Sequence, residues 1–296
     1  MTDFKNSKPT SSEGSLCEVT EELINALVEL GQQAGELILE VYHRDAGFDV
    51  DIKSDRSPVT EADKMAHHCI LDSLSTLTPD VPILSEESAL PSFTQRRAWN
   101  TYWLIDPLDG TKEFIHRNHE FTVNIALIHN GVAILGMVYV PVTGVTYIGS
   151  QKFGAFKYLA DGTQKEIAVR TIVSRIKDQK PIEIVASRRH GFENVEKMMN
   201  RLRSDYPDVI TKNIGSSLKL CLIAEGEADL YPRFGPTSEW DTAAAQAVVE
   251  AAGGAVVDMS FSTLRYNEKD DLLNPSFIVI GDTSHDWRNV LSAELA

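Results

Sequence analysis

The sequence predicts an α/β protein in two parts, an α+β half followed by an α/β half. The first observation is helical spacing of apolar residues at 20–42, with a second such pattern beginning near Thr60. The second is a stretch of alternating apolar residues at 121–148, interrupted by short turns, which is typical of an antiparallel sheet. The third is the alternation of strand-like and helix-like segments past residue 150, which favours a layered arrangement.

Two helices open the first half. Thr20 is suited to cap the first helix, and Glu21 and Glu22 suit its positive end. Thr60 and Asp63 have the spacing of a capping box at the start of the second. The positions expected to face the core are Leu23, Leu27, Leu30, Ala34, Leu37 and Val41 in the first helix and Ala62, Ala66, Cys69, Ile70 and Leu74 in the second.

Short apolar or alternating runs follow these helices and predict strands. Asn130-Gly131 joins two of them and favours a two-residue hairpin turn. Residues 44–58, by contrast, are polar and turn-rich. The strands are expected at 83–84, 102–105, 121–128, 132–140 and, after a turn at 141–144, at 145–148.

In the second half, short apolar runs alternate with helical patterns. Gly226 and Gly253 follow two of the helices and are suited to end them, because glycine adopts the left-handed conformation without strain. Strands are expected at 182–186, 228–231, 255–258 and 277–280, and helices at 191–204, 216–225 and 242–252. The predicted divisions are a flexible tail at 1–16, an N-terminal part at 17–160 and a C-terminal part at 161–296, with a soft boundary.

Composition is that of a globular protein. Of 296 residues, 43% are hydrophobic and 24% are charged, and no apolar run approaches the ~20 residues of a membrane span. Residues 1–16 lack the apolar stretch of a signal peptide, and three cysteines without close spacing favour a reducing compartment, so we expect a cytoplasmic protein. The net charge of −15 argues against a nucleic-acid polymer as partner, although bound cations can reverse the sign of a local site.

The segment 102–114 is the most informative in the chain. An apolar run leads into Asp106-Pro107-Leu108-Asp109-Gly110-Thr111, in which proline presets a turn and glycine permits a close chain approach. Two carboxylates three residues apart, with the Leu108 carbonyl between them, offer oxygen ligands for a hard divalent cation. An ordinary Asx-turn that closes a hairpin is the alternative.

Three further acids lie where ligand sites gather. Glu86 follows a strand-like pair, Asp241 is suited to cap a helix, and Asp63 lies in the first turn of another helix. Taken singly, each has a simpler interpretation, which is helix capping for Asp63 and Asp241 and a solvated loop acid for Glu86. Together with Asp106 and Asp109 they predict a magnesium site, because Mg²⁺ prefers a few carboxylates and phosphate oxygens. Two such ions about 3.5–4 Å apart can hold both oxygens of a phosphoryl displacement.

Other site chemistries are disfavoured. The eight histidines, His67-His68 included, form no metal-spaced cluster with the cysteines, which argues against zinc. The motifs G-x-x-x-x-G-K-[ST] and G-x-G-x-x-G are absent, which disfavours nucleoside triphosphates and dinucleotides.

Three blocks resemble those of the inositol monophosphatase superfamily of metal-dependent, lithium-sensitive phosphatases. They are Ser85-Glu86-Glu87, Asp106-Pro-Leu-Asp-Gly-Thr111 and Trp240-Asp-Thr-Ala-Ala244. Within that superfamily the chain is most similar to the bacterial 3′(2′),5′-bisphosphate nucleotidases, on the segments 57–63, 106–115, 120–127, 215–221 and 231–236. Inositol phosphatases tend to read T-T-N-F where this chain has Thr111-Lys-Glu-Phe114.

The resemblance implies a layered αβαβα sandwich that holds two or three Mg²⁺ ions. It implies hydrolysis of the 3′-phosphate of adenosine 3′,5′-bisphosphate to AMP by a metal-activated water, in sulfur assimilation, with the sulfated nucleotide as a further substrate. The implied roles are metal ligation by Glu86, Asp106, the Leu108 carbonyl, Asp109 and Asp241, and orientation of the water by Asp63 with Thr111. The implied substrate contacts are Glu86, Leu108, Asp109, Gly110, Thr111, His190, Ser216, Lys219, Arg233 and Asp241.

Ser216 and Lys219 also point to phosphate by their own chemistry. They lie at a predicted helix start, where a hydroxyl, the helix dipole and an ammonium together suit an anion. The alternatives are Ser216 as a helix cap, Lys219 as a solvated residue, and His190 and Arg188-Arg189 as surface residues. The aromatic candidates for base stacking, with core packing as the alternative for at least one, are Tyr231 and Phe234.

Two other functions remain alternatives. One is an inositol or sugar monophosphatase of the same superfamily, and the other is a catalytically silent module that senses nucleotide or metal. The resemblance alone leaves open a homodimer and peripheral association with the inner face of a membrane.

Overall fold

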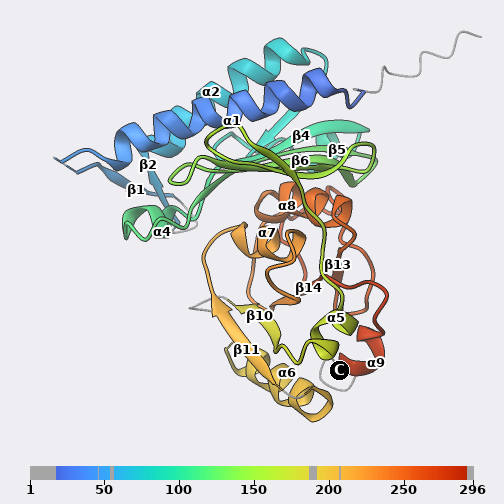
Figure 1. Cartoon of the computed structure of the whole chain (residues 1–296). Coiled ribbons are helices and arrows are strands. Elements are labelled where there is room, and N and C mark those ends of the chain that lie inside the picture. Colours follow the sequence, from blue (N-terminus) through green and yellow to red (C-terminus); the bar gives the residue numbers. More distant parts are fainter. Residues whose placement is uncertain (1–17, 46, 54–56, 187–191, 207, 292–296) are drawn as a thin grey trace, which may run out of the picture.

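The computed structural model describes residues 18–45, 47–53, 57–186, 192–206 and 208–291. In this part of the chain, helices and sheets alternate in five layers (Figure 1). Helices α1 (Glu21–Tyr42) and α2 (Glu61–Leu77) cover one face of a seven-stranded sheet, and α7 (Leu218–Ala224) and α8 (Glu239–Ala251) lie between it and a five-stranded sheet. The last layer holds α5 (Ile172–Lys177), α6 (Phe192–Asp205) and α9 (Trp287–Leu291). The predicted layered αβαβα sandwich is confirmed.

The seven-stranded sheet contains the strands predicted in the first half. Its strands run in chain order, and all neighbours are antiparallel except β3 and β4, which are parallel. The predicted Asn130-Gly131 hairpin is present, with φ angles of 48° and 76°. The strands are β3 (Ile83–Ser85), β4 (Thr101–Asp109), β5 (Thr122–His129), β6 (Val132–Val140), β7 (Val145–Ser150), β8 (Gly154–Tyr158) and β9 (Gln164–Glu166).

Sequence periodicity did not reveal several short strands. Residues 44–58, expected to be turn-rich, contribute to a hairpin of β1 (Val50–Ile52) and β2 (Pro58–Thr60). Strands β8 and β9 were also not predicted. Strands β1 and β9 are three residues long and exposed on both faces, so they carry no alternation of apolar and polar residues.

The five-stranded sheet has the order β11-β10-β12-β14-β13. Strands β10 (Ile182–Ala186), β13 (Ala255–Asp258) and β14 (Phe277–Ile280) have the predicted bounds, whereas β12 (Leu230–Arg233) begins two residues later than expected. The edge strand β11 (Val209–Asn213) was not predicted, because after Val209 its residues are exposed and mostly polar.

The helices confirm most of the local signals. Thr20 caps α1 by accepting a hydrogen bond from the Leu23 N–H at 3.2 Å, and Gly226 and Gly253 follow α7 and α8 with φ angles of 74° and 96°. Three expectations were wrong. Helix α8 begins before Asp241, with Ser238 as its cap, so Asp241 is its third residue. Leu37 and Cys69, expected in the core, are only partly buried. The two short helices not yet named are α3 (Phe93–Arg96) and α4 (Thr111–Ile115).

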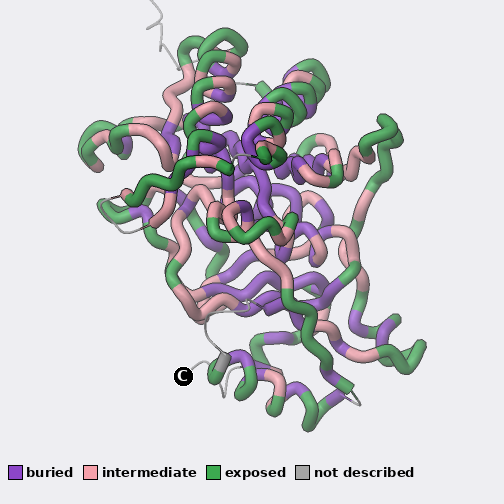
Figure 2. Tube along the Cα trace, turned by 90° about the vertical axis from the view of Figure 1, so that its left-hand side faces the viewer, coloured by how far each residue is buried: buried purple, intermediate pink, exposed green. Residues whose placement is uncertain are grey.

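Helix α8 lies unusually close to the seven-stranded sheet. Gly136 on β6 and Gly149 on β7 are cross-strand partners beneath it. A Cβ atom at Gly136 would lie 2.0 Å from the Ala244 carbonyl oxygen, and one at Gly149 would lie 2.5 Å from Val248 Cα. Because any larger side chain would lift the helix, these glycines set the distance between α8 and the sheet. Figure 2 shows that buried residues gather in these central layers.

The two halves of the chain share this core. One buried cluster combines Leu104 and Val138 of the first sheet with Ala244 and Val248 of α8 and Val279 of the second sheet. The division at residue 160 therefore stays a prediction. No helix in the described ranges has the length and apolar character that crossing a membrane requires.

Replacing Gly136 by Ala tests the close packing of α8. The added methyl group overlaps the Ala244 carbonyl, so we expect the free energy of unfolding to fall by about 3 kcal/mol in urea denaturation. Lys165→Ala on the exposed strand β9 is the control and should change that free energy by less than about 0.5 kcal/mol. Equal stabilities of Gly136→Ala and the native chain would contradict the packing.

Candidate active site

The acid turn forms where β4 leaves regular pairing. The register between β4 and β5 shifts between Asp106 and Asp109, so the chain bulges at the intervening residues. The Leu108 N–H donates to Asp106 Oδ1 at 3.0 Å, as in an Asx-turn. Gly110 has a φ of 93° and begins α4, and a Cβ there would lie 3.1 Å from the Glu120 carbonyl oxygen. The segment 106–110 therefore forms an Asx-turn and also carries the oxygen atoms predicted to bind metal.

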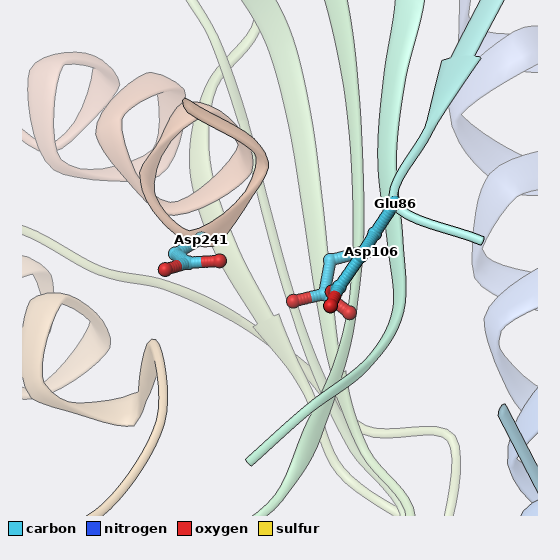
Figure 3. A group of neighbouring side chains, drawn as sticks. All are labelled: Glu86, Asp106 and Asp241. Atoms are coloured by element: carbon cyan, nitrogen blue, oxygen red, sulfur yellow. The ribbon is translucent and has the colours of Figure 1, made fainter. Parts of the chain in front are cut away.

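Three carboxylates from distant segments meet beside this turn. One oxygen each of Glu86, Asp106 and Asp241 lies within 4.8 Å of the others (Figure 3). Glu86 directly follows β3, which pairs in parallel with β4, and its N–H donates to the Ile105 carbonyl at 3.2 Å. Asp241 approaches from the first turn of α8, where one of its oxygens accepts from the Ser238 N–H at 2.9 Å. The sequence prediction that these acids lie together agrees with this geometry.

The negative charge of this cluster has the chemistry to bind a cation. Withdrawal from solvent raises the pKa of both Asp106 and Asp241 well above the usual range of an aspartate, and the neighbouring carboxylates raise each further. With pKa values raised in this way, ionising the two carboxyl groups costs free energy as long as no cation is bound. A divalent cation would neutralise that charge and accept the carboxylate oxygens as ligands, so the residues fit Mg²⁺.

Asp109 lies next to the cluster with a partner of its own. Its Oδ2 accepts from the Ser217 N–H at 2.6 Å, which leaves Oδ1 for a ligand. Burial raises the pKa of Asp109 to about 6, while the Lys219 ammonium and the Ser217 N–H act in the opposite direction. Asp109 and Asp241 both line the adjoining cavity, so they connect the acid cluster with the space for a substrate.

A cation of the protein already contacts one of the predicted ligands. Lys53, just after β1, has its Nζ atom 2.8 Å from Glu86 Oε1 and also donates to Glu87. No local pattern marks Lys53 as part of the site, because its contact with Glu86 joins residues 33 positions apart.

Asp63 and Thr111 lie together on the other side of the turn. Asp63 Oδ2 accepts from the Thr60 N–H and hydroxyl, both at 2.7 Å, which is the predicted capping box. Its second oxygen, Oδ1, accepts from the Thr111 hydroxyl at 3.2 Å. That hydroxyl also lies 3.3 Å from the Leu108 carbonyl oxygen. The capping role of Asp63 and its contact with Thr111 therefore exist together.

A cavity of about 160 Å³ opens beside these groups. Ser216 on its wall has a φ of 50° and precedes α7. The cap position is taken by Ser217, but Ser216 Oγ accepts from the Leu218 N–H at 3.4 Å, so the alternative of a capping role for Ser216 agrees with its side-chain contact although not with its position. Gly215 is required by close packing, because a Cβ there would lie 2.8 Å from Glu113 Cγ. The predicted contacts that line the cavity are Asp109, Gly110, Ser216, Lys219, Arg233 and Asp241.

Lys219 is buried rather than solvated, at 6% exposure. Its ammonium donates to the carbonyls of Ser216 at 2.6 Å and Ile214 at 3.4 Å, and it lies 5.4 Å from the centre of the Tyr231 ring. Burial lowers the pKa of Lys219 to about 8, and Asp109 acts against that shift. Two backbone contacts leave one ammonium hydrogen for the cavity.

Arg233 also faces the cavity. One terminal nitrogen donates to the Pro236 carbonyl at 3.0 Å, while the buried Nε atom has no hydrogen-bond partner. Tyr231 packs edge-on against Phe277, and Phe234 packs against the core of the outer layer, so both contribute to packing. His190 and Arg188-Arg189 lie outside the described residues.

Comparisons with known proteins show the family of this chain. Residues 19–290 match the inositol monophosphatase family. The chain belongs to this family. Members of the family generally depend on Mg²⁺, and the acid cluster of this chain has the chemistry to bind such an ion.

Individual family members are similar over nearly their whole length. The 3′(2′),5′-bisphosphate nucleotidase CysQ of Escherichia coli K12 is 48% identical over 257 residues, which are 87% of this chain and 99% of that protein. The same enzyme of Haemophilus influenzae is 37% identical over 92% of this chain and 97% of that protein. The crystal structure of CysQ from Bacteroides thetaiotaomicron has a TM-score of 0.72 at 41% identity, covering 87% of this chain and 97% of that chain.

Replacing Asp241 by Asn tests the acid cluster as a cation site. In chelator the variant should melt higher than the native chain, by about 2–4 °C for each kcal/mol of relieved repulsion, and the upward shift of the melting temperature by Mg²⁺ should be lost.

Asp229→Asn is the matched control. Asp229 is a buried acid that two nitrogens of Arg170 bind at 2.7 Å, so this variant should melt lower but keep the Mg²⁺ shift. A full Mg²⁺ shift in Asp241→Asn would contradict the shared site.

Proposed function

We propose that this chain is a Mg²⁺-dependent phosphomonoesterase that hydrolyses the 3′-phosphate of adenosine 3′,5′-bisphosphate, releasing AMP and phosphate. The observation that carries the proposal is the meeting of Glu86, Asp106 and Asp241 beside a cavity that also holds Lys219 and Arg233. Such a site combines a place for divalent cations with positive groups for a second anion. Similarity to bisphosphate nucleotidases over 87% of the chain supports the choice of substrate.

The metal ligands in this proposal are side-chain and backbone oxygens of three segments, the residue after β3, the end of β4 and the first turn of α8. Glu86, Asp106, the Leu108 carbonyl, Asp109 and Asp241 would hold two or three ions between them. When bound, Mg²⁺ supplies neutralisation of phosphate charge and a lower pKa for water, which makes hydroxide available near neutral pH. The raised pKa values of Asp106 and Asp241 support this role, because cations would stabilise the ionised carboxylates.

Asp63 and Thr111 would orient the attacking water. The Thr111 hydroxyl donates to Asp63 Oδ1, so its lone pairs remain to accept a hydrogen bond from water. Thr60 holds the other Asp63 oxygen and fixes the direction of the carboxylate. Burial raises the pKa of Asp63, which suits a group that helps to accept a proton.

The remaining proposed contacts would bind the substrate away from the reacting phosphorus. The guanidinium of Arg233, which lines the cavity, and the remaining hydrogen of Lys219 suit the second phosphate, together with the Ser216 hydroxyl and His190. Gly110 would let the substrate approach the turn closely. The sulfated nucleotide carries the same 3′-phosphate and is a further proposed substrate.

Location and assembly are proposed from the sequence. We propose a cytoplasmic enzyme that acts on a small nucleotide rather than a nucleic-acid polymer, consistent with its net charge of −15. Homodimer formation and peripheral association with the inner membrane are implied by family resemblance only.

A phosphate-release panel tests the substrate. With Mg²⁺, adenosine 3′,5′-bisphosphate and its sulfated form should give higher kcat/KM than inositol 1-phosphate or fructose 1,6-bisphosphate, and chelator or lithium should inhibit. Faster release from inositol 1-phosphate would replace the proposal by an inositol phosphatase. Tight nucleotide binding without release from any compound would indicate a silent sensing module.

Replacing Thr111 by Val tests the role of its hydroxyl. The side chain keeps its shape but can no longer link Asp63 to water, so kcat should fall by about 10²–10⁴-fold. Binding of nucleotide and of Mn²⁺, measured by calorimetry, should be retained. Thr111→Ser preserves the hydroxyl and should keep most of the activity. Undiminished turnover in Thr111→Val would remove this residue from the mechanism.

A further inference from the structure

A buried polar chain connects β5 with the start of α7. The Ser217 hydroxyl donates to Asn124 Oδ1 at 2.8 Å and lies 2.8 Å from Thr122 Oγ1. The exposed fractions of Thr122, Asn124 and Ser217 are 0%, 1% and 2%. Thr122 and Asn124 are the cross-strand partners of Asp109 and Asp106, so the chain begins beside the acid turn.

The backbone of Ser217 continues this chain to a proposed metal ligand. Its N–H donates to Asp109 Oδ2 at 2.6 Å. One residue therefore joins the end of β4, the strand β5 and the first turn of α7, which come from both halves of the chain.

The side chain of Ser217 departs from the usual behaviour of its position. A serine at a helix cap normally accepts a hydrogen bond from the first helical turn, which stabilises the helix by about 1 kcal/mol. The Ser217 side chain makes no such bond, because its hydroxyl is engaged by β5. Asn124 Nδ2 is also buried without a partner. The contact between α7 and β5 thus lacks a helix-cap hydrogen bond and leaves one buried donor unpaired. Such local losses of stability are expected at functional sites.

We infer that Ser217 is a positioning residue for Asp109. Its hydroxyl, held by Thr122 and Asn124, fixes the start of α7 so that the Ser217 N–H binds one Asp109 oxygen and leaves the other for a cation. The inference rests on the metal role proposed for Asp109, but not on the identity of the substrate. The same segment contains Ser216, whose carbonyl accepts a hydrogen bond from the Lys219 ammonium. Fixing this segment therefore positions both the proposed metal ligand Asp109 and the proposed phosphate contacts Ser216 and Lys219.

Mn²⁺ binding to the full chain, measured by electron paramagnetic resonance without substrate, tests this role. Ser217→Ala keeps the backbone N–H that binds Asp109 but removes the hydroxyl that holds the start of α7 on β5. It should weaken Mn²⁺ binding about fivefold, as expected for loss of one hydrogen bond. Ser150→Ala on β7 is the matched control, because Ser150 is a buried serine outside the site whose Oγ accepts from the Phe153 N–H at 3.2 Å, and it should leave Mn²⁺ affinity unchanged. In activity assays Ser217→Ala should need more Mg²⁺ for half-maximal rate, with kcat restored at saturating Mg²⁺.

Asp109→Asn and Thr122→Val separate the outcomes. If Asp109→Asn loses Mn²⁺ affinity while Ser217→Ala does not, the inference is overturned and the proposed function stands. If Asp109→Asn itself binds Mn²⁺ normally, the proposed metal assignment is wrong. If Ser217→Ala does not fold, Thr122→Val replaces it in the test, because it keeps the shape of the side chain and removes the hydroxyl that contacts the Ser217 hydroxyl. Native Mn²⁺ affinity in Thr122→Val would then overturn the inference.

Discussion

The close approach of α8 to the seven-stranded sheet is the constraint on which the site depends. Gly136 and Gly149 leave no side chain between the sheet and the alanine-rich face of the helix. The first turn of α8 is therefore held beside the end of β4, and Asp241 faces Asp106 across the junction of the two halves (Figure 3). A catalytic cluster drawn from distant segments needs this kind of rigid support, because ligand positions must hold within a fraction of an ångström.

The packed core supports an arrangement that is locally unfavourable. The acids of the cluster lie near one another, Asp106 is buried, and the raised pKa values of Asp106 and Asp241 reflect that energy. Lys53 offsets part of the charge at Glu86, and the Ser217 N–H does so at Asp109. The remaining imbalance would give the site affinity for divalent cations, so the account attributes repulsion in the free protein and metal binding to one geometry.

Local signals allowed much of this fold to be predicted. The Thr20 cap, the Asn130-Gly131 turn and the glycines after α7 and α8 each act through neighbouring residues, so the sequence reveals them directly. The exposed strands β1 and β9 have no such pattern, because their pairing rather than their side-chain periodicity holds them in place. The first residue of α8 was misplaced because both Ser238 and Asp241 are good capping residues.

The acids of the site could be predicted as a group, but the groups that hold them could not. Thr122, Asn124 and Ser217 lie in segments that carry the family resemblance, but no local pattern assigns a role to them or to Lys53. Each gains its role from a residue more than 30 positions away. The burial of Lys219 likewise depends on the packing of α7 against Tyr231, which no local pattern records. Tertiary contacts therefore supply the parts of the site that motifs omit.

Anomalous diffraction from crystals soaked in Mn²⁺ tests the central claim most directly. The account predicts one peak, or neighbouring peaks that share Asp106, next to the oxygens of Glu86, Asp106 and Asp241. The distances from peak to oxygen should be about 2.1 Å, which is typical of magnesium. Peaks that touch none of these acids, or that leave Asp241 without an ion, would contradict it.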